Sequence, residues 1–203
     1  MFGHNPYSSS IPDPERESFL GDMTRAGIVG GLMLALIMVA GEQVAERLDT
    51  ALFGGILLVF GIFVHMVCNM LAVVTYGLGA ALMVANLNPI VAVMAATGPL
   101  APLWFFTNST TSFGGRFVHY NLIGKDIREM SWLETFLVCL GGQIMNSSVL
   151  LLAQLFYFEL PIRTLLLFKF GEFVAGALLP SLVVWQVGKL LKRRSRQRKL
   201  MDS

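Results

Sequence analysis

The feature that most constrains this chain is a long stretch without charge. Residues 51–85 include no Asp, Glu, Lys or Arg. One helix over these 35 residues would be about 52 Å long, whereas the hydrocarbon layer of a membrane is about 30 Å thick. The stretch therefore predicts two membrane-spanning helices. Polar side chains at His65, Cys68 and Asn69 indicate the break between them, which gives helices over 51–67 and 70–86.

Four further apolar stretches predict four more helices. They cover residues 26–45, 90–106, 132–158 and 164–191. Asn86, Asn88 and Pro89 favour a turn before the second of these stretches, and Pro161 favours one before the last. Pro99 is expected to kink its helix, because proline removes a backbone hydrogen bond.

Composition agrees with a membrane protein. Charged residues make up 14% of the chain and the mean hydropathy is +0.65, whereas a soluble domain is about one quarter charged. Residues 107–131 are the one substantial polar loop between the apolar stretches. We therefore predict an all-α fold, a polytopic membrane protein built as a bundle of six transmembrane helices.

The placement of Lys and Arg predicts the orientation. With six helices, the two chain ends and the loop 107–131 share one side and carry twelve of these residues. The other side carries two, Arg47 and Arg163. Positive charge accumulates in cytoplasmic segments, so we expect both termini in the cytoplasm of a multi-pass protein of the cell membrane. The expected parts are a tail over 1–24, a transmembrane domain over 25–192 and a basic tail over 193–203.

Seven Lys and Arg residues lie within the last fifteen residues. A basic run can bind nucleic acid, but this one directly follows an apolar helix. We therefore expect it to contact the anionic surface of the lipid bilayer, with no nucleic-acid partner. Residues 1–25 lack the short apolar core and the cleavage site of a signal peptide.

The sequence shows no motif for catalysis, metal binding or nucleotide binding. Cys68 and Cys139 lack nearby His or Cys partners, and His4, His65 and His119 are far apart in the chain. We therefore expect no enzyme activity, no metal and no cofactor, and any energised transport would need a separate ATPase. The two cysteines are expected to be small apolar residues rather than a disulfide.

Small residues recur every four positions in the first helix, at Gly27, Gly31 and Ala35. Such a stripe lets a neighbouring helix approach closely. It would serve either packing within the bundle or docking to a separate membrane subunit, and the sequence leaves both open.

Polar groups inside the predicted fifth helix point to a buried face. The spacing of Gln143, Asn146, Ser147 and Gln154 places their side chains on one side of that helix. Lipid offers no hydrogen bonds, so this face must look into the bundle, either to join helices or to line a cavity. The pair Lys169 and Glu172 is expected to be a structural ion pair or a ligand contact.

Residues 104–116 combine aromatic side chains with hydroxyl and amide side chains. This mixture is typical of a small-molecule pocket, but an aromatic belt beside a polar loop has the same composition. As a ligand site we predict the following residues: Trp104, Thr107, Asn108, Thr111, Gln143, Asn146 and Glu172.

With six predicted helices, cytoplasmic ends and the stripe Gly27, Gly31 and Ala35, the chain resembles the substrate-binding subunits of energy-coupling factor transporters. The resemblance covers residues 25–192. It implies capture of a vitamin-like small molecule from outside, and docking through the first helix to a transmembrane coupling subunit with ATPases. The competing interpretation is a membrane scaffold or assembly factor without a ligand, and an intramembrane enzyme ranks third. A cavity that opens outward among the fourth, fifth and sixth helices would favour the transporter subunit.

Overall fold

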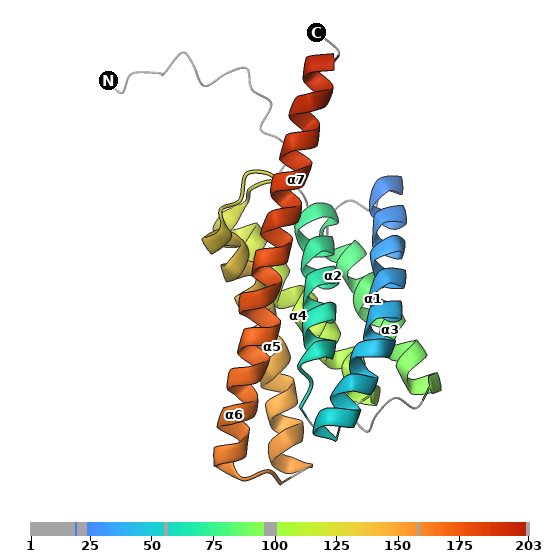
Figure 1. The fold of residues 1–203 in the computed structure, drawn as a ribbon, viewed down its shortest axis with the longest axis vertical. Coiled ribbons are helices and arrows are strands. Elements are labelled where there is room, and N and C mark those ends of the chain that lie inside the picture. Colours follow the sequence, from blue (N-terminus) through green and yellow to red (C-terminus); the bar gives the residue numbers. More distant parts are fainter. Residues whose placement is uncertain (1–18, 20–23, 55–56, 96–100, 158, 202–203) are drawn as a thin grey trace, which may run out of the picture.

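The described part of the chain is all-α and forms six helices (Figure 1). A computed structural model describes residues 19, 24–54, 57–95, 101–157 and 159–201. The first three helices are α1 (Arg25–Phe53), α2 (Phe60–Tyr76) and α3 (Leu78–Ala95). The fourth comprises η1 (Ala101–Leu103), α4 (Trp104–Val118) and the π-helical η2 (His119–Ile123), and the fifth is α5 (Trp132–Phe156). The sixth is continuous through α6 (Ile162–Phe173), the π-helical η3 (Val174–Leu178) and α7 (Leu179–Met201).

Successive helices run in opposite directions. The start of α1 and the end of α7 therefore lie at the same end of the bundle, at the top of Figure 1. We call this the basic end, because α7 carries the C-terminal run of Lys and Arg. The central helix is α2, which packs against α1, α3, α4, α5 and α7.

The number of helices agrees with the prediction, but the break between α2 and α3 does not. It falls at Gly77, whose φ of 88° is a conformation that favours glycine. His65, Cys68 and Asn69 instead lie inside α2 and are buried. Asn69 and Ser112 exchange hydrogen bonds of 3.0 and 3.1 Å, so this polar side chain does not need to interrupt the helix.

The predicted turn at Asn86–Pro89 and the predicted loop 107–131 were also wrong. Pro89 lies within α3, and residues 104–123 are helical. The hydroxyl groups of Thr110 and Thr111 donate to the carbonyl of Thr107 in the preceding turn, which satisfies them within the helix. Only residues 124–131 are non-helical there. Pro99 lies outside the described residues, as does nearly all of the predicted tail 1–24.

The segment 124–131 is a short turn at the basic end. Gly124 ends η2 with a φ of 60°, and Ser131 begins α5 with a capping box to Glu134. Asp126 accepts hydrogen bonds of 2.8 and 2.7 Å from the Arg128 guanidinium. This hydrogen-bonded cation holds the pKa of Asp126 below its usual range.

The close contact of α4 and α5 depends on glycine. A Cβ atom at Gly114 would lie 2.4 Å from the carbonyl oxygen of Gly141, and one at Gly141 would lie 2.9 Å from that of Gly114. The two backbones therefore touch where these glycines meet. The pair Gly114 and Gly115, which is typical of a turn, is here part of a helix crossing.

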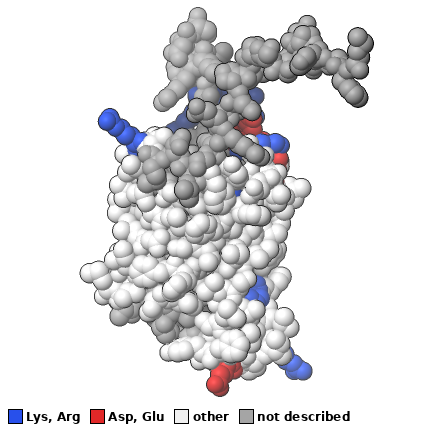
Figure 2. All heavy atoms as spheres, turned by 180° about the vertical axis from the view of Figure 1, so that it is seen from behind, with Lys and Arg blue, Asp and Glu red and all other residues white. Residues whose placement is uncertain are grey.

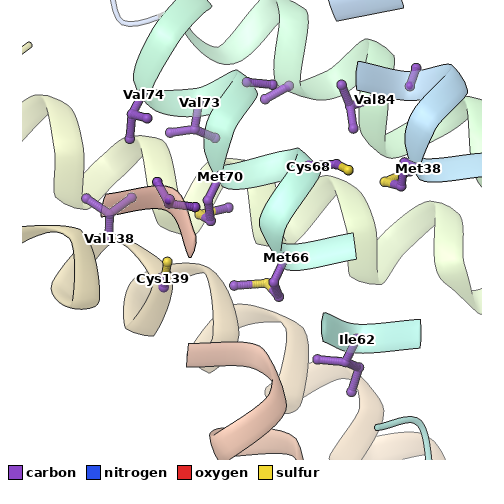
Figure 3. Packing of buried hydrophobic residues seen from close by; sticks show 14 of the residues in the cluster. Met38, Ile62, Met66, Cys68, Met70, Val73, Val74, Val84, Val138 and Cys139 are labelled. Carbon is purple, nitrogen blue, oxygen red and sulfur yellow. The ribbon is translucent and has the colours of Figure 1, made fainter. Parts of the chain in front are cut away.

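Methionine, valine and cysteine fill the core around α2 (Figure 3). Met66 and Met70 are fully buried there, and flexible side chains of this kind fill irregular gaps between helices. Cys68 and Cys139 are both buried and free, and Figure 3 shows them on different helices. The expectation that they act as small apolar residues is confirmed.

The surface is strongly apolar. Along α1 alone, Val29, Met33, Leu36 and Val44 are each more than half exposed, whereas soluble monomers rarely expose large apolar patches. Three helices are long and apolar enough to cross a membrane: Arg25–Phe53, Trp132–Phe156 and Ile162–Gln197. Charged side chains gather near the two ends with a broad uncharged band between them (Figure 2). This is the pattern of a multi-pass membrane protein.

Candidate functional site

A row of carboxylates lies on the buried face of α1. Glu42, Glu46 and Asp49 follow one another at helical spacing, and their exposed fractions are 3%, 3% and 0%. The sequence indicated that this helix ends near residue 45, but it continues to Phe53. The buried face of α1 therefore carries small residues in the first half of the helix and carboxylates in the second half.

Asp49 has a structural role. Its Oδ1 accepts hydrogen bonds from the backbone N–H groups of Val59 and Phe60 at 3.0 and 3.1 Å, and its Oδ2 accepts one from Gly61 at 2.8 Å. These N–H groups belong to the first turn of α2, where a helix lacks internal partners and favours negative charge. Asp49 thus fixes the start of α2 against the end of α1.

The other two carboxylates face polar side chains of neighbouring helices. The Oε1 of Glu42 lies 3.5 Å from the Nδ1 of His65 in α2, and both side chains are almost fully buried. The Oε1 of Glu46 accepts a hydrogen bond of 3.3 Å from the Nδ2 of Asn88 in α3. Glu42 and Glu46 thus each lie beside a polar side chain of a neighbouring helix.

These four side chains border a cavity of about 30 Å³. Its other walls come from the start of α2, from α4 and from α5. These walls are formed by Leu58, Gly61, Ile62, Trp104, Thr107, Asn108, Asn146 and Leu150. The lining thus combines carboxylate, imidazole, amide and indole groups with a few aliphatic side chains.

Several polar atoms around the cavity have no hydrogen-bond partner within the described part of the protein. Three of them are oxygens: Glu42 Oε2, Asn88 Oδ1 and Asn146 Oδ1. Both ring nitrogens of His65 and the indole nitrogen of Trp104 share this property. A buried polar group without a hydrogen bond costs about 1–3 kcal/mol. An occupant that forms hydrogen bonds with these atoms would therefore be favoured in the cavity.

All walls of the cavity come from the same half of the bundle. They belong to the end of α1, the start of α2, the end of α3, the start of α4 and the end of α5. Because successive helices are antiparallel, these segments meet at the end opposite the basic end (Figure 1). The cavity lies among α1 to α5, and α6 does not line it.

Of the seven predicted ligand-site residues, four line the cavity: Trp104, Thr107, Asn108 and Asn146. The other three lie outside it. Thr111 donates to the carbonyl of Thr107, and Gln143 donates to Ser147 at 2.8 Å. Glu172 lies in a separate network of α5 and α6.

That network satisfies Glu172 completely. Its Oε1 accepts a hydrogen bond from Gln154 at 3.0 Å. Its Oε2 accepts hydrogen bonds from Ser147 at 3.1 Å and from Lys169 at 2.6 Å. The ion pair of Lys169 and Glu172 is therefore part of a polar network that holds α6 against α5. This arrangement corresponds to the structural ion pair, one of the two predicted alternatives.

The small-residue stripe of α1 is covered by its own chain. Gly27, Gly31 and Ala35 are all buried, and a Cβ atom at Gly31 would lie 3.2 Å from the Cβ of Ala80 in α3. These small residues therefore allow close packing between helices of the same bundle. The outer face of α1 carries large apolar side chains instead, among them Met33 and Leu36.

Glu42, Glu46, His65 and Asn88 were missed as site residues. The signal that could have found them is periodicity, because Glu42, Glu46 and Asp49 continue the spacing of Gly31, Ala35 and Met38. His65 and Asn88 were read as interruptions of helices, since their partners on other helices are far away in the sequence.

The described residues include no group of three or more His, Cys, Asp and Glu side chains placed to bind a metal ion. Comparison of the chain with known protein families, with curated proteins and with solved structures finds no match.

Proposed function

We propose that this chain is a six-span membrane protein that captures a small solute in the acidic cavity. One observation carries the proposal: buried polar atoms from five helices surround the cavity without partners in the described part of the protein. Glu172 and Asn69, which join helices outside the cavity, are paired. The Oε1 atoms of Gln143 and Gln154 also lack a partner there, but most of the unpartnered buried side-chain atoms belong to residues that line the cavity. A binding site, in contrast, leaves its hydrogen bonds open for a ligand.

The charge distribution supports capture from outside. The run of Lys and Arg in α7 supports a cytoplasmic basic end under the positive-inside rule. The cavity then lies in the outer half of the bundle. α2 has 17 residues and would span about 25 Å, which a membrane accommodates by local thinning.

The resemblance to substrate-binding subunits of energy-coupling factor transporters fits this arrangement in chain length, helix number and the common side of both ends. In that case a separate coupling subunit with ATPases would drive uptake. The partner would contact the exposed apolar face of α1, because the small-residue stripe is covered by α3. A scaffold or assembly factor is the second candidate, and the network of Glu172, Gln154 and Ser147 favours it.

Mass spectrometry of small molecules that co-purify with the protein tests the proposal. The informative variant is Leu150→Phe, which enlarges a buried side chain in the cavity wall. The matched control is Leu152→Phe on the same helix, where the side chain is 57% exposed. We expect a molecule bound to wild type and to Leu152→Phe but lost from folded Leu150→Phe. Equal retention by both variants, or no bound molecule in wild type, would favour the scaffold.

A further inference from the structure

We infer that the cavity binds a primary ammonium group, either a small alkylammonium ion or the amine end of a larger solute. The inference rests on the proposed function and specifies the ligand class for the same site. Three features of the cavity lead to it: its charge, its pattern of donors and acceptors, and its size.

The cavity has acidic character. Glu42 and Glu46 contribute carboxylates to the lining, and none of its described lining residues is Lys or Arg. The third carboxylate of α1, Asp49, is already held by three backbone N–H groups. His65 is the one basic lining residue, and it lies next to Glu42. A cation that enters the cavity would therefore favour the ionised form of these carboxylates, because water screens opposite charges little at this depth.

Three lining residues offer acceptor oxygens without a partner in the described part of the chain, which is the kind of group that an ammonium ion needs. They are Glu42 Oε2 from α1, Asn88 Oδ1 from α3 and Asn146 Oδ1 from α5. The orientation of the Asn88 amide is fixed, because its Nδ2 donates to Glu46. A primary ammonium carries three N–H donors and no acceptor, so it offers donors to oxygens of this kind and needs none in return. Trp104 adds an aromatic wall, which also suits a cation.

The size of the cavity limits what enters it. About 30 Å³ corresponds to roughly two water-sized spheres, each of about 10–15 Å³. An ammonium or methylammonium group has this size, whereas a quaternary ammonium is larger and has no N–H donor. A site for a transition metal is not indicated, since no suitable group of three ligands occurs among the described residues.

Isothermal titration calorimetry of the purified full-length protein tests the inference. The probe is methylammonium chloride, compared at constant ionic strength with the chlorides of potassium, sodium and tetramethylammonium and with neutral formamide. We expect measurable binding of methylammonium alone. Glu42→Gln should weaken it at least tenfold, because the side chain keeps its shape and loses its charge. Glu134→Gln is the control with the same change of charge at the basic end, and it should bind like wild type.

Each other outcome overturns the inference in a distinguishable way. Tighter binding of potassium or sodium would identify an alkali-metal site. Binding of formamide that is insensitive to Glu42→Gln would identify a neutral ligand, and the proposed function would stand. The inference would fail and the proposed function would stand if no probe binds but wild type carries a small molecule that Leu150→Phe loses. If no probe binds and no molecule co-purifies, the proposed function fails together with the inference. Should Glu42→Gln fail to fold, the comparison of probes on wild type still decides.

Discussion

Neighbouring carboxylates of one helix face have different roles at the scale of single residues. Asp49 receives three backbone hydrogen bonds and holds two helices together. Glu42, two turns earlier, keeps one oxygen directed at a cavity without a partner. Both are buried acids, so burial alone does not separate a structural residue from a binding residue. The separation comes from counting hydrogen bonds.

We predict that Asp49→Ala destabilises the protein by about 2–3 kcal/mol. The reason is that three N–H groups at the start of α2 lose a charged acceptor, and hydrogen bonds to charged groups contribute about 1.5–3 kcal/mol. Thermal unfolding in detergent measures the effect. Asp49→Asn keeps an acceptor oxygen, so its stability should lie between that of wild type and that of Asp49→Ala. An unchanged midpoint in Asp49→Ala would show that water or another group caps α2.

The candidate site could be predicted in part from single residues. The amide of Asn146 and the hydroxyl and indole groups of Thr107 and Trp104 stand out in apolar segments, and all three line the cavity. Glu42 and His65 did not stand out as a pair. They are 23 positions apart, and only the packing of α1 on α2 brings them within 3.5 Å.

At the scale of helices, the crossing of α4 and α5 is set by glycine rather than by large side chains. Gly114 and Gly141 let the two backbones touch, which places Asn108 and Asn146 at one cavity. The position of the site therefore depends on residues that do not contact it.

We predict that Gly114→Ala lowers stability by about 1–3 kcal/mol, because the new methyl group would overlap the backbone of Gly141. Gly171→Ala in α6 is the matched control, since its nearest neighbouring atom would be 3.9 Å away. That change should leave stability equal or raise it by up to about 1 kcal/mol through helix propensity. Denaturation in a mixed-detergent titration compares them. Equal effects of the two changes would mean that the helices do not touch at Gly114.

Helix number was predictable and helix boundaries were not. The length of residues 51–85 exceeds the membrane thickness, and this correctly predicted two helices where α2 and α3 lie. Their bounds were wrong, because residues 51–53 belong to α1 and α3 continues to Ala95. The break itself falls at the single residue Gly77, because polar residues such as Asn69 find partners on other helices. Thr110 and Thr111 were read as loop residues for the same reason: their hydroxyl groups are satisfied inside α4.

At the scale of the whole molecule, the arrangement of six antiparallel helices separates a basic end from an end with a polar cavity (Figure 1). The positive-inside rule then assigns a side of the membrane to each end. Capture of an external solute requires this assignment.

Cysteine labelling of intact cells tests the assignment. Asp126→Cys lies in the exposed turn at the basic end, and Arg163→Cys lies at the exposed start of α6 at the other end. Cys68 and Cys139 are buried, so wild type serves as the unlabelled background. We predict that an impermeant maleimide labels Arg163→Cys in intact cells and Asp126→Cys only after lysis. The reverse pattern would place the cavity on the cytoplasmic side.

The central claim is that the cavity residues serve a ligand rather than the fold. Two buried asparagines allow a matched comparison. Asn69 exchanges hydrogen bonds with Ser112, whereas the Oδ1 of Asn146 faces the cavity without a partner in the described part of the chain. The same replacement by leucine removes a satisfied group in one case and an unsatisfied group in the other.

Thermal unfolding of the two variants, in protein freed of small molecules by extensive dialysis, is the most direct measurement. We predict that Asn69→Leu is less stable than wild type by about 1–3 kcal/mol, because its hydrogen bonds are lost. Asn146→Leu should be as stable as wild type or more stable, and it should no longer bind the ligand. Ligand-free Asn146→Leu that is destabilised as strongly as Asn69→Leu would contradict the account, because Asn146 would then be a structural residue.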